Sequence, residues 1–312
     1  MFKISGFFLM KITVCIPTYN RPDLLKEAMD SCLSQTFLPF EILIGDDSTN
    51  NETRELVETY KDASAIDIGY FKNEPPLGQA ANVNGLFKNA SGEKIVLLHD
   101  DDLLMETALE KMMKCFQSDN TIQAVYGKQY IIDERGVVNK KHSEELNTYY
   151  FRTAYYSTNK LSPLEAGMVQ QFPNDCYMVD RTVIEKINYR SKTEIGHAGD
   201  FDFGFRLGVS GINLHFINAY TAKYRITESS IARNRTDSGY QAFRIIQQAG
   251  ITANSKKTDP VNLILKRKAP VAILQAVEKG KRREALNIYF SKWHRNKILT
   301  LGGIRRLINI IS

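Results

Sequence analysis

Three consecutive carboxylates, Asp100, Asp101 and Asp102, follow a short apolar run in this chain of 312 residues. The run, Ile95 to Leu98, has the length of a strand and is apolar throughout, as expected of a parallel strand that helices cover on both faces. Adjacent acids at a strand end repel one another, and each needs solvent, a cation or a hydrogen-bond donor. The pattern therefore predicts either a divalent metal site that also holds a phosphorylated ligand or a solvated acidic turn that caps the next helix.

Two further polar clusters follow predicted strands, Thr18-Tyr19-Asn20 after Lys11–Ile16 and Asp46-Asp47 after Phe40–Ile44. In an open α/β sheet the carboxyl ends of the strands meet at one edge, where ligands bind. A carboxylate there can accept a base N–H or a ribose hydroxyl, and Tyr19 can stack on a base. Alternatively, the Asp pair caps a helix and Tyr19 is an aromatic residue at the rim. Neither alternative explains why all three clusters lie at carboxyl ends.

The first hundred residues alternate four times between strand-like and helix-like patterns. Such alternation predicts an α/β fold with a parallel sheet and right-handed crossovers, typical of nucleotide-binding domains. Residues 140–167 lack a clear period and are predicted to form a mobile excursion. Neither a Gly-x-x-x-x-Gly-Lys loop nor a Gly-x-Gly-x-x-Gly turn follows the first strand. Ligand phosphates would therefore need another source of positive charge, and a metal on the acids would serve.

Five motifs in order resemble family 2 glycosyltransferases with the GT-A fold: Pro17-Thr-Tyr-Asn-Arg, Gly45-Asp-Asp-Ser, Gly78 to Asn84, Ala90-Ser-Gly-Glu and Leu97-Leu-His-Asp-Asp-Asp-Leu. The resemblance covers roughly residues 10–235. It implies a Rossmann-like nucleotide-binding mixed sheet flanked by helices. We expect this GT-A domain to span 10–238 and a helical basic region to span 239–312.

The resemblance also implies roles for the residues at the strand ends. Tyr19 and Asp47 would hold the nucleotide base, with Asp46 as a neighbour. The acidic run would be the family's DxD-type motif, which contacts the ribose and a Mn²⁺ or Mg²⁺ on the diphosphate. By position, Asp100 would contact the ribose, and Asp101 and Asp102 would bind the metal. His99 aligns with the motif's usual first acid. The expected nucleotide contacts are Pro17, Thr18, Tyr19, Asn20, Asp46, Asp47, Asn84 and Asp100.

The family's catalytic base is an acid that opens a later helix, and Gly199-Asp-Phe-Asp-Phe-Gly-Phe-Arg206 fits that pattern with Gly199 in place of a Glu. The resemblance makes Asp200 the base and Asp202 its nearest rival. An acid at a helix start is otherwise a plain N-terminal charge. Thr227 stands where many relatives carry a histidine.

Three arginines near that position, Arg225, Arg233 and Arg235, either contact phosphate or are surface residues without a role.

The basic charge is concentrated in the last part of the sequence. Residues 255–312 hold fourteen Lys and Arg against three Asp and Glu, so this tail carries +11 and the remaining residues carry −5. Basic segments with interspersed Trp, Phe and Ile commonly lie on anionic membranes, whereas in other proteins such helices simply pack on a domain. No nucleic-acid recognition motif appears.

Four scattered cysteines without metal-type spacing suit a reducing compartment. We expect a cytoplasmic protein, peripheral on the inner face of the cell membrane through the tail.

The resemblance implies an inverting, metal-dependent glycosyltransferase of the hexosyltransferase type. It would move a sugar from a nucleotide sugar, UDP-linked, to a hydroxyl of a glycan or lipid-linked acceptor in polysaccharide biosynthesis. Two alternatives stay open. A sugar nucleotidyltransferase should show a Gly-rich loop with Arg or Lys after the first strand, and residues 17–23 lack the glycines. A nucleotide-sugar-binding relative without activity would keep Asp47 and Asp101 but need no base.

Overall fold

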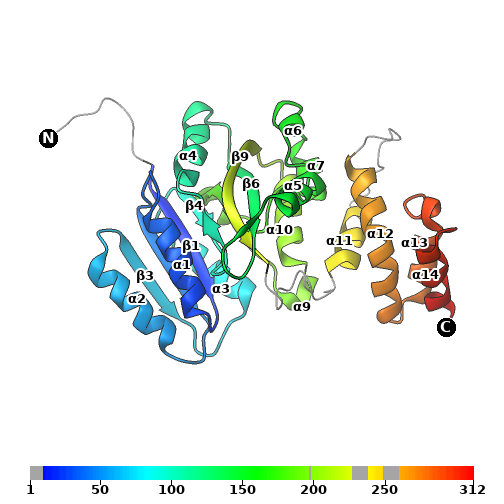
Figure 1. The fold of residues 1–312 in the computed structure, drawn as a ribbon, viewed down its shortest axis with the longest axis horizontal. Helices are drawn as coiled ribbons and strands as arrows, with labels where there is room; N and C mark the ends of the chain where they lie inside the picture. Colours follow the sequence, from blue (N-terminus) through cyan, green and yellow to red (C-terminus); the bar gives the residue numbers. More distant parts are fainter. Residues whose placement is uncertain (1–9, 197, 227–237, 249–259) are drawn as a thin grey trace. The chain divides into compact units, whose positions relative to one another are not determined.

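The computed structural model describes residues 10–196, 198–226, 238–248 and 260–312 (Figure 1). The chain divides into two compact units. The first falls within Met1–Lys160, Phe172–Tyr189 and Gly211–Thr227. The second falls within Leu161–Gln171, Arg190–Ser210 and Glu228–Ser312.

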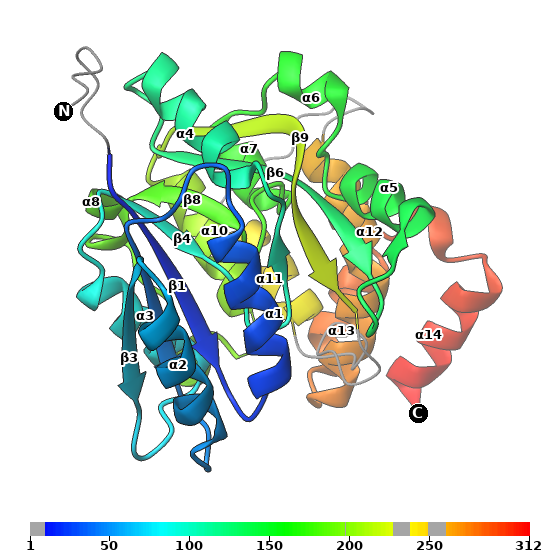
Figure 2. The ribbon, with the colours of Figure 1, turned by 60° about the vertical axis from the view of Figure 1, so that its left-hand side comes forward.

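The first unit is built on one mixed sheet (Figure 2). Its strands are β1 (Ile12–Thr18), β2 (Glu41–Asp46), β3 (Asp67–Lys72), β4 (Lys94–Leu97), β5 (Leu103–Leu104), β6 (Ala124–Ile132), β7 (Val138–Asn139), β8 (Tyr177–Asp180) and β9 (Leu214–Arg225). Among the described residues the strand order is β3-β2-β1-β4-β8-β6-β9-β5, and β7 pairs with β6. The helices of this unit are α1 (Pro22–Leu33), α2 (Glu52–Ala63), α3 (Gln79–Asn89), α4 (Ala108–Ser118), α5 (Lys140–Tyr149), α6 (Ala154–Thr158) and α8 (Arg181–Ile184).

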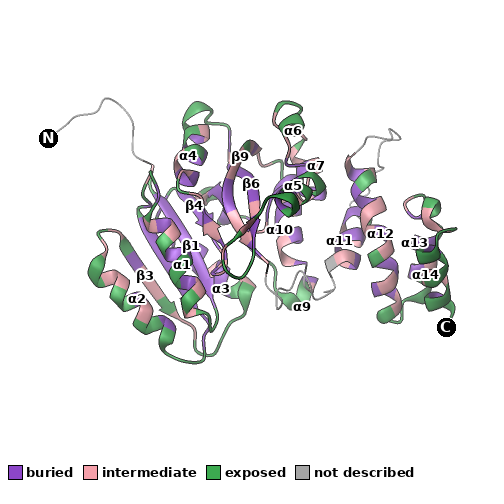
Figure 3. Cartoon of the chain, viewed as in Figure 1, coloured by how far each residue is buried: buried purple, intermediate pink, exposed green. Residues whose placement is uncertain are grey.

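The first four strands in sequence run parallel and are the strands that the apolar runs predicted. Thr18 lies opposite Asp46 across β1 and β2, and Cys15 lies opposite Leu97 across β1 and β4. All residues of β1, β2 and β4 are buried (Figure 3). Helices α1 and α4 contribute to the core on one face of these strands, and α3 packs on β1 and β2. The carboxyl ends of β1, β2 and β4 therefore reach one edge of the sheet together.

Residues 140–167 are not the mobile excursion that the sequence suggested, because they contain α5, α6 and most of α7. The contacts of α5 explain the error. Ser143 and Asn147 are buried on α5 and bind the backbone of β6: the Ile131 N–H donates to Ser143 Oγ over 2.8 Å, and Asn147 Nδ2 donates to the Gln129 oxygen over 2.9 Å. A helix that packs through polar side chains carries no apolar period in its sequence.

The second unit is helical within the described residues. Its helices are α7 (Pro163–Met168), α9 (Lys192–Ile195), α10 (Gly199–Val209), α11 (Ser238–Gln248), α12 (Pro260–Glu278), α13 (Arg282–Tyr289), the short 3₁₀ helix η1 (Arg295–Lys297) and α14 (Leu301–Ile311). Helix α12 packs against α11, α13 and α14. Across the described residues, no helix combines the length and the apolar character needed to cross a bilayer.

A close approach between β2 and α3 requires glycine at position 45. A Cβ on Gly45 would lie 2.0 Å from Asn82 Oδ1 and 3.1 Å from Leu86 Cγ. The approach allows Asn82 Nδ2 to donate to the Gly45 oxygen over 2.8 Å. By contrast, a Cβ on Gly85, one turn further along α3, would meet no atom within 4 Å among the described residues.

Gly45→Ala should lower the free energy of unfolding by about 1–3 kcal/mol, since the new methyl group displaces a buried, hydrogen-bonded amide. Gly85→Ala should raise it by about 0.5–1 kcal/mol, because alanine restricts the unfolded chain and fits an open helical position. Equilibrium urea unfolding of both variants checks the pair. Equal effects of the two substitutions would contradict this account of the contact.

Candidate active site

Three turns meet at the carboxyl edge of the parallel strands. The turn after β1 contacts the turn after β4, because the Thr18 hydroxyl donates to Asp100 Oδ2 over 2.8 Å. It also contacts the turn after β2: the Asn20 N–H donates to Ser48 Oγ over 2.7 Å, and the Thr49 N–H donates to Asn20 Oδ1 over 3.0 Å. Asn20 has a φ of 52°, a conformation that asparagine tolerates better than most residues. These bonds bring together the polar clusters that the sequence placed at three strand ends.

Tyr19 is the exposed member of the turn after β1. Its side chain is accessible, with the residue 53% exposed, and its N–H lies 3.4 Å from Asp100 Oδ2. Pro17, also an expected nucleotide contact, is a buried strand residue opposite Gly45. An exposed aromatic ring beside a polar turn can stack on a planar base.

Arg21 supplies positive charge to the acidic turn. Its Nη1 lies 3.4 Å from Asp100 Oδ1 and 3.0 Å from Asp101 Oδ2. Burial and the Asp101 charge raise the pKa of Asp100, although Arg21 and the Thr18 hydroxyl act in the opposite direction. The Asp101 side chain is 22% exposed, whereas that of Asp100 is 9% exposed. Asp101 is therefore the carboxylate of this pair that solution ions reach more easily.

Asp102 is buried beneath the same turn. Its Oδ1 accepts the Arg225 N–H over 2.7 Å, and within the described part of the chain its buried Oδ2 accepts no hydrogen bond. Burial and the neighbouring carboxylates of Asp175 and Asp101 raise the pKa of Asp102 well above its usual range. Two ionised carboxylates cannot donate to one another, so Asp102 and Asp175 need a proton or a cation between them.

The ligand atoms of His99, Asp101 and Asp102 lie within 4.8 Å of one another. Two carboxylates and an imidazole suit a transition-metal ion such as Mn²⁺, and the Asp102 oxygen without a hydrogen bond is a further acceptor for it. The residues present therefore fit a divalent cation. Nothing in the sequence indicated that His99 is a ligand, because the histidines show no ligand spacing and His99 only aligns with the motif's first acid. The structure adds Asp175, which is fully buried and accepts the His99 N–H over 3.1 Å.

Arg225 is not available for the phosphate contact that the sequence suggested. Its side chain is 1% exposed, and its Nη2 lies 2.5 Å from Glu27 of α1. Nε donates to the backbone oxygen of Asp101 over 2.9 Å, and Nη1 donates to the backbone oxygens of Asp133 and Glu134. Arg225 therefore holds the acidic turn in place from the end of β9.

The positions of Thr227, Arg233 and Arg235 lie outside the described residues, so the expectations for them stay open.

Asp46 has a structural role in place of the expected nucleotide contact. It is fully buried and accepts bonds from the Ser48 N–H (2.7 Å), the Tyr70 hydroxyl (2.6 Å) and Lys72 Nζ (3.1 Å). Burial alone would raise its pKa, but these bonds outweigh burial and lower the pKa below its ordinary 3.8. The stability that Asp46 contributes is thus present above that value and is lost as the pH falls through the lower folded pKa.

Asp47 keeps one position for a ligand. Its Oδ1 accepts from Asn73 Nδ2 (2.9 Å) and the Leu77 N–H (3.1 Å), and its Oδ2 accepts from the Gly78 N–H (2.8 Å). A carboxylate offers about four acceptor positions, so one on Oδ2 remains with respect to the described residues. This geometry is compatible with one base N–H.

Asn84 is occupied by the protein, contrary to its expected role in nucleotide binding. Its Nδ2 donates to the Tyr189 oxygen over 2.8 Å, and its Oδ1 accepts the Tyr189 N–H over 2.9 Å. Both ends of the amide therefore hold α3 to the segment that follows β8.

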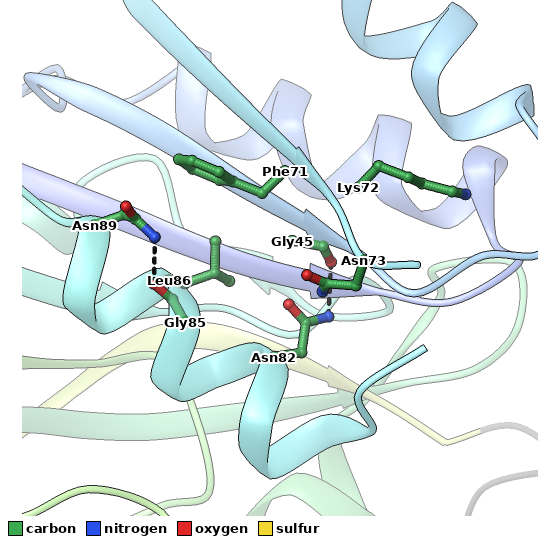
Figure 4. Close-up of a pocket in the computed structure, with 8 residues that line it drawn as sticks. All are labelled: Gly45, Phe71, Lys72, Asn73, Asn82, Gly85, Leu86 and Asn89. Atoms are coloured by element: carbon green, nitrogen blue, oxygen red, sulfur yellow. Dashed lines mark hydrogen bonds between the residues drawn. The ribbon is translucent and has the colours of Figure 1, made fainter. Parts of the chain in front are cut away.

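A pocket of about 380 Å³ lies between β3 and α3 (Figure 4). Its lining consists of Gly45, Phe71, Lys72, Asn73, Asn82, Gly85, Leu86 and Asn89. In Figure 4 the Asn82 amide points toward Gly45 and the Asn89 amide toward Gly85. Side-chain amides and an aromatic ring suit a planar polar group. The pocket adjoins Asp47 through Asn73, which donates to it.

The two candidate bases differ in their surroundings on α10, in the second unit. Asp202 is 2% exposed, and its oxygens lie 3.4 Å from Arg190 Nη1 and 2.6 Å from Arg206 Nε. Each carboxylate oxygen of Asp202 is therefore engaged by an arginine. Asp200 is half-buried.

The sequence is similar to known glycosyltransferases. The family model described as Glycosyl transferase family 2 matches residues 13–177. An uncharacterised glycosyltransferase of Methanocaldococcus jannaschii is 28% identical over 217 residues, which are 69% of this chain and 70% of that protein. An Escherichia coli UDP-Glc:alpha-D-GlcNAc-diphosphoundecaprenol beta-1,3-glucosyltransferase is 27% identical over 230 residues, which are 72% of this chain and 80% of that protein.

A solved structure is similar over nearly the whole chain. The mannosyltransferase of Pyrobaculum calidifontis, in complex with GDP-Man and Mn²⁺, has a TM-score of 0.62 at 17% identity, covering 97% of this chain and 86% of that chain. At this identity the likeness concerns the fold. It confirms the GT-A fold that the sequence motifs predicted.

The two strand-end acids Asp101 and Asp46 should respond differently to removal. Asp101→Ala should abolish Mn²⁺-dependent UDP binding and change the free energy of unfolding by no more than about 0.5 kcal/mol, because its side chain is accessible. Asp46→Ala should lower the free energy of unfolding by about 3 kcal/mol or more, since it leaves the ammonium group of Lys72 without its buried carboxylate partner. Calorimetric UDP titration and urea unfolding of both variants measure the difference. Unchanged Mn²⁺-dependent UDP affinity in Asp101→Ala would refute the metal assignment.

Proposed function

This chain belongs to glycosyl transferase family 2, and from that premise we propose that it is an inverting, metal-dependent transferase using a UDP-linked sugar. The proposal rests on three groups that lie at one edge of the sheet. They are an exposed aromatic ring, a carboxylate with one acceptor position left among the described residues, and an acidic turn. Tyr19, Asp47 and the Asp100–Asp102 turn provide these groups. They match the parts of a nucleoside diphosphate: base, ribose and charged phosphates.

The donor would lie across the three turns of the first unit. Tyr19 stacks on the base, and the remaining acceptor position of Asp47 Oδ2 takes a base N–H. Asp100, already held by the Thr18 hydroxyl, accepts from the ribose. The name of the Escherichia coli relative supports a UDP-linked donor, whereas the Pyrobaculum structure holds a GDP-linked one. We therefore name UDP as the expected nucleotide and GDP as the competitor in its test.

The charge of the diphosphate would be balanced at the acidic turn. His99, Asp101 and Asp102 would hold a divalent cation there. When bound, that cation stabilises the negative charge of the departing nucleoside diphosphate. Arg225 and Asp175 act on the protein side: the first fixes the backbone of Asp101, and the second fixes that of His99. Arg21, which pairs with Asp100 and Asp101, would be a further cation for the phosphates.

The transfer step is a single displacement. The acceptor hydroxyl oxygen forms a bond to the anomeric carbon as the bond from that carbon to the phosphate oxygen breaks. The electron pair leaves with the nucleoside diphosphate, and the acceptor proton passes to the Asp200 carboxylate. Family resemblance assigns this role to Asp200 and makes Asp202 its nearest rival. Inversion gives a β linkage from an α-linked donor, and a β-1,3 linkage stands in the name of the Escherichia coli relative.

The acceptor would be a growing glycan, lipid-linked, in polysaccharide biosynthesis. The support is the diphosphoundecaprenol sugar in the name of the same relative. A lipid-linked acceptor lies at a membrane, so we place the protein on the cytoplasmic face of the cell membrane.

The function is tested by a donor screen with Mn²⁺ that follows nucleotide release. UDP-hexoses should release UDP by slow hydrolysis without acceptor, and GDP-sugars should release far less. Mn²⁺-dependent release from GDP-sugars alone would move the donor assignment to GDP. No release from any nucleotide sugar, together with measurable UDP binding, would favour the non-catalytic alternative.

Asp200→Asn should reduce transfer at least a hundredfold and leave UDP affinity within about twofold, because the base acts on the acceptor. Asp202→Asn is the matched control: it should lower the free energy of unfolding, since it weakens two ion pairs in a buried position. Steady-state transfer rates, UDP titration and urea unfolding separate the two effects. Near-normal turnover in Asp200→Asn would remove the base assignment.

A further inference from the structure

Helix α14 exposes a stripe of large apolar side chains. Leu301 is 89% exposed, Ile304 49%, Ile308 54% and Ile311 69%. Their spacing of three, four and three residues places them on one side of the helix. Figure 3 shows α14 largely exposed, whereas α12 beside it has a buried face. A soluble surface rarely keeps such a stripe uncovered without a binding purpose.

The stripe is fixed in place by the packing of the opposite side of α14. Gly303 and Ile310 are buried there, and α14 packs on α12 and α13. A Cβ on Gly303 would lie 2.0 Å from the Lys297 oxygen, so the helix start fits tightly against the preceding turn. Arg306 Nε donates to Nε2 of the buried His294 over 3.1 Å. The exposed side is therefore the side that the fold leaves outward.

The surroundings of the stripe are positively charged. Residues 285–312 contain five Lys and Arg and no Asp or Glu. Lys292, Arg295 and Arg305 are exposed. Leu299, two residues before the start of α14, is 93% exposed and adds to the apolar surface. Apolar side chains beside cations without any acid are the composition of helices that lie in the interface of anionic bilayers.

We infer that the stripe Leu301, Ile304, Ile308 and Ile311 binds an anionic lipid bilayer, with the helix lying flat in the headgroup region. Charge argues against a second copy of the chain as the occupant, because pairing two such segments would bring the exposed Lys292, Arg295 and Arg305 of both copies together. An RNA phosphate backbone would use the cations but leave the isoleucines in water. An anionic bilayer would bury the apolar side chains and also pair its headgroups with the cations.

The inference narrows the role of the basic tail. In α12 the apolar residues Ile264, Leu265 and Ile273 are buried by helix packing, so that part of the tail is a docked helix. Leu263 and Val271 of α12 are 37% and 45% exposed, whereas α14 exposes four large apolar residues on one side. The benefit of membrane binding rests on the proposed lipid-linked acceptor, but the binding itself needs neither donor nor acceptor, and its test is therefore independent of transfer.

Vesicle co-sedimentation of the full chain tests the inference. The vesicles are phosphatidylcholine alone or phosphatidylcholine mixed with phosphatidylglycerol, at low and at high salt. Leu301→Gln/Ile311→Gln removes the two most exposed members of the stripe, and Leu38→Gln/Val137→Gln removes two apolar residues, 53% and 60% exposed, from the first unit as a control. Arg305→Glu is compared with Lys141→Glu, another exposed cation.

The wild type should sediment with anionic vesicles at low salt and remain in the supernatant with neutral ones. Arg305→Glu should weaken the partition at least fivefold, the ratio that ~1 kcal/mol per cation gives. Leu301→Gln/Ile311→Gln should weaken it at least tenfold, and both controls should match the wild type. Sedimentation that is unchanged in the α14 variants would overturn the inference. A wild-type dimer in analytical ultracentrifugation that Leu301→Gln/Ile311→Gln dissociates would also overturn it and would assign the face to self-association.

Discussion

The turn after β4 gathers more negative charge than its buried position tolerates without cations. Asp100 and Asp102 are buried, their pKa values are raised, and Asp175 adds a third buried carboxylate beside Asp102. Cationic side chains of the protein neutralise only part of this charge. Arg21 reaches Asp100 and Asp101 from the surface, and one oxygen of Asp102 is left without a hydrogen bond among the described residues. We therefore propose that this turn binds a divalent cation.

The sheet and the acidic turn stabilise one another. Arg225 ends β9, pairs with Glu27 of α1, and binds the backbone oxygen of Asp101. Its own N–H satisfies Asp102. The strand pairing of β9 with β5 therefore positions the turn between β4 and β5, and loss of the turn's geometry would leave the buried Nε of Arg225 without its acceptor. At this edge Asp46 is held by hydrogen bonds within the fold, whereas we propose Asp47 and Asp101 as ligand contacts.

The parts of the fold that rest on apolar burial could be predicted from the sequence. The runs in β1, β2 and β4 identified the parallel strands, and their ends identified the edge where the turns meet. The errors arose where polar side chains are buried through hydrogen bonds. Helix α5 packs on β6 through Ser143 and Asn147, and Asn84 binds a backbone 105 residues away. No local pattern distinguishes such residues from ligand contacts, because their partners are set by the fold.

The central claim is that the acidic turn binds the donor nucleotide through a divalent cation. Isothermal titration of UDP into the wild-type protein, once with Mn²⁺ and once with excess EDTA, tests this claim most directly. The account predicts a binding isotherm with Mn²⁺ and a loss of affinity of at least tenfold in EDTA. Equal UDP affinity under both conditions would contradict it.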